Sequence, residues 1–275
     1  MNYLEVKFTY NSTEVNGDIL LAELTQIPFE SFVENEVEII GYILLDLWDK
    51  KALEELLYLQ ENQVEVTINE IEQVNWNEEW EKNFDPILIS NDCVIRADFH
   101  NLEKTYKFDI RINPKMSFGT GHHETTSLVL TEMLNIDFVD TKVLDMGTGT
   151  AVLAILAAMK GAKNVLAIDN DEWAYKNSIE NVELNHYLDK IDVVEGSIQS
   201  MGDKKFNVIL ANINKNIIKV QMESYASGLL PNARLLISGI LVEDCDEIIA
   251  LASQCGLMKI EQKQKNKWSL LVFSN

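Results

Sequence analysis

The chain lacks any long apolar run. No segment of its 275 residues approaches the roughly 18 consecutive apolar residues that a membrane-spanning helix requires. Its first residues, Met1–Lys7, also lack the basic region and apolar core of a secretory signal. Because 47% of the residues are nonetheless hydrophobic, the sequence predicts a globular, cytoplasmic protein with enough core for one large domain or two smaller ones.

Positive charge is also scarce. Lysine and arginine together number 23 against 44 aspartates and glutamates, which leaves a formal net charge of −21. An acidic surface repels the phosphates on which non-specific binding to nucleic acid depends. We therefore expect no free nucleic acid among the partners, whereas a basic protein would be attracted.

Cysteine and histidine are few and are not arranged as metal ligands. The three cysteines, Cys93, Cys245 and Cys255, form no Cys-x-x-Cys pair, and their odd count suits a reducing compartment. The four histidines do not show the i, i+4 spacing of a helical zinc site. The sequence thus predicts no metal site, and thiols that are buried or idle.

The most informative feature that is present is a glycine turn within Val143–Ala154. An apolar strand there ends at Asp145, turns on Gly147 and Gly149, and continues into an apolar helix. Glycines tolerate positive φ and let backbone N–H groups approach a ligand at the positive end of the helix dipole. A second strand ends in Asp169, an acid about 20 residues beyond the turn, as ribose recognition requires. Together these residues predict a binding site for a nucleotide-like cofactor.

The turn also limits which cofactor is bound. Dinucleotide-binding folds place a third glycine three residues after the second, where helix and strand pack closely beside a pyrophosphate. Val152 occupies that position, which argues against NAD and FAD, and the turn lacks the lysine and hydroxyl residue of a P-loop. A cofactor with a ribose but no phosphate fits better, and S-adenosyl-L-methionine is the leading candidate. A nucleotide-binding oxidoreductase stays open as an alternative.

Residues 1–70 show the pattern of a small separate domain. Their periodicities follow the order strand, helix, strand, strand, helix, strand, which is typical of a ferredoxin-like α+β fold. The predicted strands and helices are 3–9, 16–25, 29–33, 37–43, 51–58 (capped by Asp49) and 64–68. Residues 71–86 follow as a predicted linker helix with Trp76, Trp80 and Phe84 on one face.

Residues 87–275 alternate strands and helices, and we expect them to form the catalytic domain. Strands are predicted at 87–90, 93–97, 105–110, 143–145, 164–168, 191–194, 206–211, 233–240, 257–262 and 268–273. Regular alternation predicts a mostly parallel sheet with right-handed crossovers, whereas the last two strands are so close that they must pair antiparallel. The expected fold is α/β: a Rossmann-like class I methyltransferase with a mostly parallel seven-stranded sheet and a C-terminal antiparallel hairpin, plus the N-terminal domain.

Four short segments resemble the motifs of one family. They are Phe118–Thr126 (Phe-Gly-Thr-Gly-His-His-Glu-Thr-Thr), Leu144–Thr150, Ile168–Asp171 and Ala211–Ile213. The first is similar to the Phe-Gly-Thr-Gly-Thr-His-Pro-Thr-Thr segment of the ribosomal protein L11 methyltransferases, and the resemblance covers nearly the whole chain. It implies an S-adenosyl-L-methionine-dependent protein N-methyltransferase that methylates amines of L11, either lysine side chains or the N-terminal amine. It also implies that the N-terminal domain binds this protein substrate.

The resemblance further implies which residues form the site. Thr126, Gly147, Asp169 and Asn212 fall on the family's cofactor-contacting positions, and Gly149 belongs to the same turn. Asn212 is the expected catalytic residue, because its side-chain oxygen would accept an N–H of the acceptor amine and direct the lone pair. Methyl transfer needs little beyond positioning and desolvation. We therefore expect no protein nucleophile and no metal.

The chain departs from the family's pattern at three positions. His122 stands where the family has threonine, Glu124 where it has proline, and Ala151 where it usually has glycine. None of these changes removes a chemically required group, and the segment 118–126 is expected to form a lid over the cofactor. Besides an oxidoreductase, the alternatives are a methyltransferase for another protein amine or amide and a non-catalytic ribosome-associated protein. We expect a monomer without membrane contact.

Overall fold

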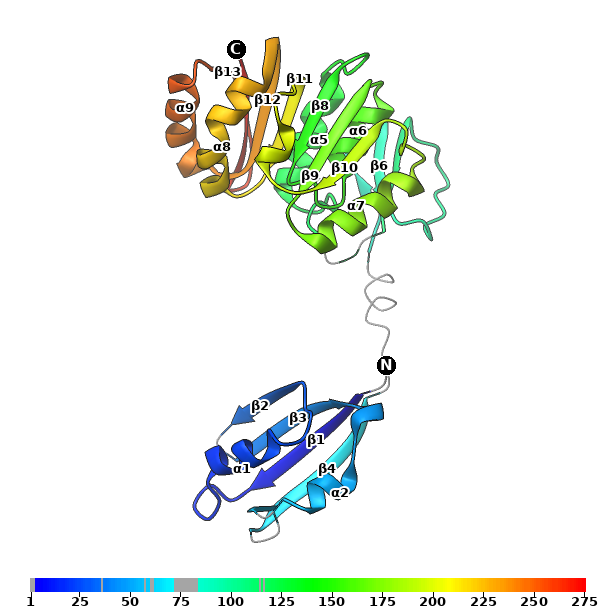
Figure 1. Cartoon of the computed structure of the whole chain (residues 1–275). Coiled ribbons are helices and arrows are strands. Elements are labelled where there is room, and N and C mark those ends of the chain that lie inside the picture. The colour runs from blue at the N-terminus through cyan, green and yellow to red at the C-terminus, as the bar shows by residue number, and fades with distance from the viewer. Residues whose placement is uncertain are drawn as a thin grey trace. The chain divides into compact units, whose positions relative to one another are not determined.

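The protein consists of two compact units, Met1–Trp80 and Glu81–Asn275. The structure is a computed structural model that describes residues 3–35, 37–56, 58–59, 62–71, 84–113, 115 and 117–275. Figure 1 shows the N-terminal unit in blue and cyan and the sheet and helices of the C-terminal unit in green to red. The predicted linker helix over residues 71–86, with Trp76 and Trp80, lies mostly outside the described residues.

The N-terminal unit is a four-stranded antiparallel sheet with helices packed on one face. Its elements are β1 (Tyr3–Tyr10), α1 (Gly17–Leu24), β2 (Ser31–Asn35), β3 (Glu38–Leu44), the 3-10 turn η1 (Leu45–Leu47), α2 (Lys50–Glu54) and β4 (Val64–Ile71). The sheet order is β2-β3-β1-β4, and every neighbouring pair is antiparallel. This order confirms the predicted ferredoxin-like fold.

Alternation of apolar residues in β1 forms the core of this unit. Leu4, Val6 and Phe8 are buried, and they pack in one cluster with Leu20 and Leu24 of α1. Successive side chains of a strand point to opposite faces, so this period of two buries one face of the sheet and leaves the other polar.

Helices α1 and α2 each begin at a side-chain cap, and the sequence predicted one of the two, Asp49. Asn16 Oδ1 accepts the Asp18 N–H at 3.0 Å, and Asp49 Oδ1 accepts the Lys51 N–H at 2.8 Å. The predicted helix over residues 51–58 is interrupted, because α2 ends at Glu54 and residues 58 and 59 are helical again. A 3-10-type bond from the Leu56 N–H to the carbonyl of residue 53 tightens and ends the helix there.

The C-terminal unit is built on a seven-stranded, mostly parallel sheet. Its strands are β8 (Lys142–Met146), β9 (Asn164–Asp169), β10 (Ile191–Glu195), β11 (Phe206–Asn212), β12 (Leu229–Leu241), β13 (Met258–Lys265) and β14 (Trp268–Ser274). The order is β10-β9-β8-β11-β12-β14-β13, and β14 is antiparallel to both of its neighbours. The sheet confirms the predicted parallel core with its C-terminal antiparallel hairpin.

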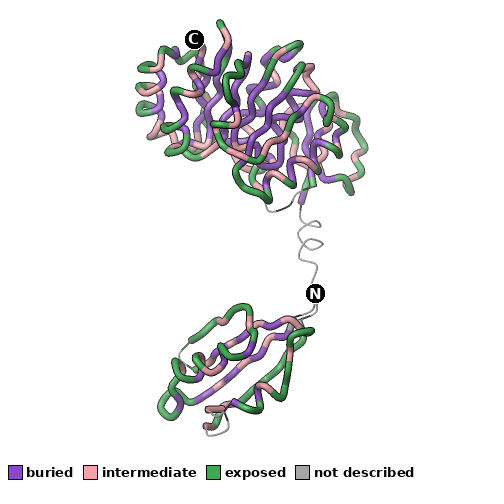
Figure 2. The backbone as a smooth tube through the Cα atoms, viewed as in Figure 1, coloured by how far each residue is buried: buried purple, intermediate pink, exposed green. Residues whose placement is uncertain are grey.

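Helices cover both faces of this sheet (Figure 1). They are α5 (Glu124–Asn135), α6 (Val152–Met159), α7 (Glu172–Leu184), α8 (Lys215–Gly228) and α9 (Cys245–Gln254), with 3-10 turns η2 (Ile198–Met201) and η3 (Val242–Asp244). Side chains of α5, α6 and α7 pack into one hydrophobic core, and those of α8 and α9 pack into a second. Figure 2 shows the buried backbone concentrated in the strands between them, as expected for a sheet covered on both faces. No helix in the described part of the chain has the length and apolar character to cross a membrane.

A small three-stranded sheet packs against the first of these cores. Its strands are β5 (Ile87–Leu88), β6 (Cys93–Arg96) and β7 (Phe108–Arg111), in the order β5-β6-β7. Cys93, Ile95, Phe108 and Ile110 are buried in the same cluster as residues of α5 and α6. The last strand begins at residue 108 rather than 105, because its register with β6 starts where Phe108 lies opposite Cys93.

Three asparagines, two in α7 and one at its C-cap, form hydrogen bonds along the open edge of β7. We call Asn177, Asn181 and Asn185 the asparagine ladder; all three are buried. Asn185 Oδ1 accepts the Arg111 N–H at 2.9 Å, and its Nδ2 donates to the Arg111 carbonyl at 2.5 Å. Asn181 Oδ1 accepts the Asn113 N–H at 2.7 Å, and Asn177 Nδ2 donates to the Asn113 carbonyl at 3.1 Å. The side-chain amides thus replace the backbone of a further strand.

Candidate functional site

A cavity of about 530 Å³ lies at the carboxyl edge of the sheet, where the parallel strands end. Its walls come from the turn after β8, the ends of β9 and β11, the loop before α5 and the start of β14. Of the predicted site residues, Gly147, Gly149, Asp169 and Asn212 line it. Open α/β sheets bind their ligands in this position, outside the carboxyl ends of the strands.

The two glycines of the turn adopt the left-handed backbone conformation that their residue type favours. Gly147 has a φ of 70° and Gly149 a φ of 57°. A Cβ on Gly149 would lie 2.2 Å from the Phe118 carbonyl oxygen, which accepts the Thr150 N–H at 2.9 Å. Thr150 Oγ1 also donates to the Gly119 carbonyl at 2.7 Å. Glycine is required here because the backbone of the loop before α5 lies directly on the turn.

That loop is shorter than the segment 118–126 suggests. His123 is the N-cap of α5, so the helix begins at Glu124 and includes Thr125 and Thr126. Glu124 therefore replaces the family's proline at the first helical position, where proline is tolerated and an acid is favoured by the helix dipole. A hydrogen bond from Asn266 Nδ2, 3.1 Å from Glu124 Oε1, lowers the pKa of this carboxyl. The departure at residue 124 is thus structurally accommodated.

Asp169 connects the glycine turn to the end of β9. Its Oδ2 accepts the Gly149 N–H at 2.8 Å, and its Oδ1 accepts the Asp171 N–H at 3.1 Å. An ionised carboxylate has about four acceptor positions, so two backbone bonds leave capacity for ligand hydroxyls. Asp169 as a whole residue is 9% exposed and lines the cavity, in the position that ribose recognition requires.

Asn212 ends β11 with an acceptor that has no partner. Its Nδ2 donates to Thr126 Oγ1 at 3.2 Å, whereas its Oδ1 is buried without a hydrogen bond. Thr126 is itself completely buried, and its neighbour Thr125 lines the cavity. Because buried polar atoms in native proteins are nearly always paired, the free oxygen marks a place for a ligand donor. Thr126 does not line the cavity, and it contributes to the site through this hydrogen bond to the Asn212 side chain.

Asp145 is a functional candidate that the sequence analysis did not single out. It is completely buried, and its Oδ2 accepts from Thr148 Oγ1 at 2.6 Å and from the Ala154 N–H at 3.2 Å. Its Oδ1 has no partner. Burial raises the pKa of Asp145 to about 7, the nearby Asp169 acts in the same direction, and the two hydrogen bonds oppose them. The available signal was an acid at the carboxyl end of an otherwise apolar strand.

Ala151 carries strain that the family's usual glycine would avoid. It precedes α6 with a φ of 64° and is completely buried. A residue with a Cβ in this conformation costs roughly 1–2 kcal/mol relative to its favoured conformations. The tight turn is therefore maintained at this position against the backbone preference of alanine.

Three rings line the side of the cavity formed by the loop before α5 and the start of β14. The ring centroids of Phe118 and His123 are 5.2 Å apart, and those of His123 and Trp268 are 4.9 Å apart. His123 Nδ1 accepts the Thr125 N–H at 3.3 Å as the cap of α5. We call Phe118, His123 and Trp268 the aromatic wall. Trp268 was predicted only as the start of a strand, since nothing in a single sequence reveals which strand end faces the glycine turn.

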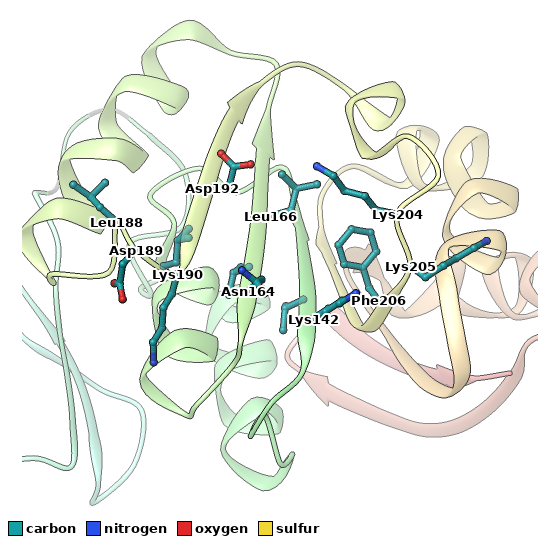
Figure 3. Close-up of a pocket in the computed structure, with 13 residues that line it drawn as sticks. Lys142, Asn164, Leu166, Leu188, Asp189, Lys190, Asp192, Lys204, Lys205 and Phe206 are labelled. Atoms are coloured by element: carbon teal, nitrogen blue, oxygen red, sulfur yellow. The ribbon is translucent and has the colours of Figure 1, made fainter.

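A second cavity, of about 460 Å³, lies at the opposite, amino edge of the same sheet (Figure 3). It is formed around the first residues of β8, β9, β10 and β11. The charged residues that line it are Lys142, Lys190, Lys204, Lys205, Asp189 and Asp192. Lys205 Nζ donates to the Ser227 carbonyl. None of the motifs found in the sequence contributes to this cavity.

The cysteines lie apart from the carboxyl-edge cavity. All three are free; Cys93 and Cys245 are buried, and Cys255 is half-buried. Burial raises the pKa of Cys93 to about 12, so that thiol stays protonated. The described ranges contain no group of three or more histidine, cysteine, aspartate or glutamate side chains suited to hold a metal ion.

Residues 10–275 match the model of a protein family described as "Ribosomal protein L11 methyltransferase (PrmA)". This chain belongs to that family. A relative named ribosomal protein L11 methyltransferase in Bacteroides thetaiotaomicron is 44% identical over 280 residues, which cover 100% of both chains. A relative of the same name in Porphyromonas gingivalis is 40% identical over 272 residues, covering 95% of this chain and 91% of that one.

A solved structure extends the similarity to the fold. The crystal structure of ribosomal protein L11 methylase from Lactobacillus delbrueckii subsp. bulgaricus aligns with a TM-score of 0.65 and 27% identity. The alignment covers 70% of this chain and 99% of that chain. Together with family membership, it confirms the resemblance seen in Phe118–Thr126, the α/β methyltransferase fold, and the expectation that the protein is a methyltransferase.

Proposed function

We propose that the carboxyl-edge cavity binds S-adenosyl-L-methionine. Its volume of about 530 Å³ lies within the roughly 300–1,000 Å³ of small-molecule sites. Among the described residues that line it there is no lysine or arginine, whereas Asp169 and Asp171 are present. This lining suits a cofactor that has a ribose and a positive charge but no phosphate. When bound, S-adenosyl-L-methionine supplies a methyl group on a cationic sulfonium.

The roles of the surrounding residues follow from their positions. Gly147 and Gly149 would bring the backbone of the turn against the cofactor, and Asp169 would accept from its ribose hydroxyls. Asn212 would accept an N–H of the incoming amine through Oδ1 and direct the nitrogen lone pair, while Thr126 holds the amide from behind. An amine that enters this less polar environment loses its proton more readily, because burial lowers its pKa.

The partnerless Asn212 Oδ1 is the observation that supports amine methylation most directly. A buried amide oxygen without a donor suits a substrate that brings N–H groups into the cavity. We therefore propose that the acceptors are amines of ribosomal protein L11, on lysine side chains or at its N-terminus. The names of the relatives from Bacteroides thetaiotaomicron and Porphyromonas gingivalis support L11 as the substrate. The net charge of −21 supports a basic protein as the substrate.

We further propose a division of labour along the chain. Residues 1–70 would bind the protein substrate, and residues 71–86 would connect this domain to the catalytic domain. Residues 87–275 would bind the cofactor and catalyse methyl transfer. We propose that the protein is a cytoplasmic monomer, and its net charge of −21 supports a basic protein rather than free nucleic acid as its substrate.

Transfer of labelled methyl groups tests this proposal. The enzyme, labelled S-adenosyl-L-methionine and unmethylated L11 are incubated together, and cofactor binding is measured separately by calorimetry. We expect both cofactor binding and labelled L11. Cofactor binding without labelled L11 would refute the substrate and point to another protein amine, and a folded protein that does not bind the cofactor would refute the cofactor site. Mass spectrometry of L11 from cells with and without the gene would locate the modified amines.

A further inference from the structure

The aromatic wall presents three neighbouring rings to the cavity. The His123 ring lies between those of Phe118 and Trp268, and its Nδ1 accepts the Thr125 N–H at 3.3 Å as the cap of α5. Phe118 is 54% exposed although it is a large apolar residue. Its exposed ring borders a cavity instead of filling a core, which is typical of a binding surface.

The acids that line the same cavity are engaged elsewhere. Asp169 accepts the backbone N–H groups of Gly149 and Asp171, and Asp171 Oδ1 accepts the Ala174 N–H at 2.8 Å as the cap of α7. Both carboxylates are thus bound to the glycine turn and to the start of α7, where we place the cofactor. The three residues of the aromatic wall carry no carboxylate, and the neighbouring Glu124, whose Oε2 lies 4.0 Å from His123 Nε2, accepts a hydrogen bond from Asn266 Nδ2 at 3.1 Å.

We infer that the aromatic wall is the binding site for the alkylammonium group of the acceptor, which it holds by cation–π contacts. This inference rests on the proposed function, because it names how the same cavity recognises its second substrate. Ammonium groups bind over the faces of tryptophan and phenylalanine within about 6 Å of the ring centroid. Trp268 already has an ammonium at such a distance, since Lys267 Nζ lies 5.7 Å from its ring centroid.

An aromatic site suits methyl transfer better than a carboxylate would. A carboxylate beside the amine would raise the pKa of the amine and retain the proton that must leave before the nitrogen can attack. An aromatic face attracts the cation without accepting a hydrogen bond from it, so that the proton is held less firmly. The same face accepts an ammonium that carries a methyl group, because the contact does not depend on an N–H.

Tetramethylammonium chloride is the probe for this site, because it is a cation without any N–H. Its binding to the full-length protein is measured by broadening of its methyl NMR signal, and its effect on methyl transfer to L11 is measured in parallel. We expect it to bind and to compete with L11. The Trp268→Leu variant should lose this binding and raise the KM for L11 by roughly 2- to 30-fold, with the Kd for S-adenosyl-L-methionine unchanged within about twofold.

Two further variants guard against effects on folding and on exposed tryptophan in general. Trp268→Phe retains an aromatic face and should keep most of the tetramethylammonium binding. Trp173→Leu removes a tryptophan that is 80% exposed on α7 and is not part of the aromatic wall, so it should bind the probe as the unmodified protein does.

Several results would overturn the inference. These are absence of probe binding to the unmodified protein, unchanged probe binding or unchanged KM in Trp268→Leu, or a Kd for the cofactor that rises as much as the KM for L11. If the unmodified protein binds the probe and Trp268→Leu does not, yet L11 receives no label, then the proposed substrate is wrong and the ammonium site stands.

Discussion

At the carboxyl edge of the sheet, the cavity is bordered by glycines and buried acceptors, whereas lysines and aspartates surround the cavity at the amino edge. The two cavities have similar volumes, about 530 and 460 Å³. Among the residues that line the two cavities, those with left-handed backbone are Gly147, Gly149 and Gly239, and all three border the carboxyl-edge cavity. The partnerless oxygens of Asp145 and Asn212 also lie towards the carboxyl ends of their strands.

This difference teaches that cavity size alone does not identify a site. Strained backbone and unpaired buried oxygens cost folding free energy, so a protein retains them where a ligand or a reaction uses them. The lysines of the amino edge lie at the starts of strands, and Lys205 bonds a backbone carbonyl. Substitutions at the two edges should therefore have unequal consequences.

The largest effect should come from removing the partnerless oxygen of Asn212. We expect Asn212→Ala to lower kcat by about a hundredfold, because loss of positioning by even about 1 Å can cost this much. The cofactor Kd and the methyl-transfer rate to L11 are measured for this variant and for Lys190→Ala at the amino edge. Lys190→Ala should behave as the unmodified protein, and equal losses in both variants would remove the contrast between the two edges.

The next effect should be on how stability depends on pH. Asp145 has a raised pKa of about 7 in the folded protein against roughly 4 when unfolded, so its stabilising contribution is lost as pH rises through about 7. In Asp145→Asn this loss is absent. The difference in the free energy of unfolding between the variant and the unmodified protein should therefore shift in favour of the variant between about pH 4 and about pH 7, by up to a few kcal/mol.

Urea denaturation at pH 5 and at pH 8 measures this change. The control is Asp192→Asn, which alters an exposed aspartate at the amino-edge cavity. It should shift the free energy of unfolding equally at both pH values. Parallel pH dependences for Asp145→Asn and the unmodified protein would contradict the assignment of a raised pKa.

A smaller effect should follow from interrupting the asparagine ladder. Asn181 Nδ2 donates to the Thr150 carbonyl at 3.0 Å, so Asn181 joins the glycine turn to the segment after β7. Asn181→Ala leaves the Asn113 N–H and the Thr150 carbonyl unpaired, and we expect a loss of about 2 kcal/mol in the free energy of unfolding. Glu183→Ala, at an exposed position of the same helix, should change it by less than about 0.5 kcal/mol. An equal loss in the free energy of unfolding in Asn181→Ala and Glu183→Ala would show that the hydrogen bonds of the asparagine ladder do not stabilise the fold.

The smallest effect concerns the strain at Ala151. A glycine there avoids the cost of a positive φ, so Ala151→Gly should be at least as stable as the unmodified protein. Ala157→Gly, within α6, should instead lower the free energy of unfolding by about 1 kcal/mol. Thermal or urea denaturation of both variants measures the difference, and equal losses would argue that Ala151 is not strained.

The sequence alone predicted the parts of the fold that depend on local periodicity. The buried strands, the cap Asp49, the glycine turn and the acid Asp169 at the end of the next strand each follow from a few neighbouring residues. The identity of Asn212 needed a family resemblance, because a polar residue at a strand end has many uses.

Other parts of the site depend on contacts between distant residues. Trp268 reaches the cavity only because β14 runs antiparallel and starts at the carboxyl edge. Asn181 bonds residues 113 and 150, which lie 68 and 31 positions away. No periodicity within one segment encodes such pairings, so they required the structure.

The asparagine ladder has a consequence for self-association. β7 is the last strand of its small sheet, and an exposed strand edge invites pairing with another chain. The amides of α7 occupy the backbone groups of Arg111 and Asn113 on this edge. Because a helix has no free backbone N–H and C=O groups along its side, the sheet ends at this helix. A second molecule therefore cannot add a strand to the sheet at this edge.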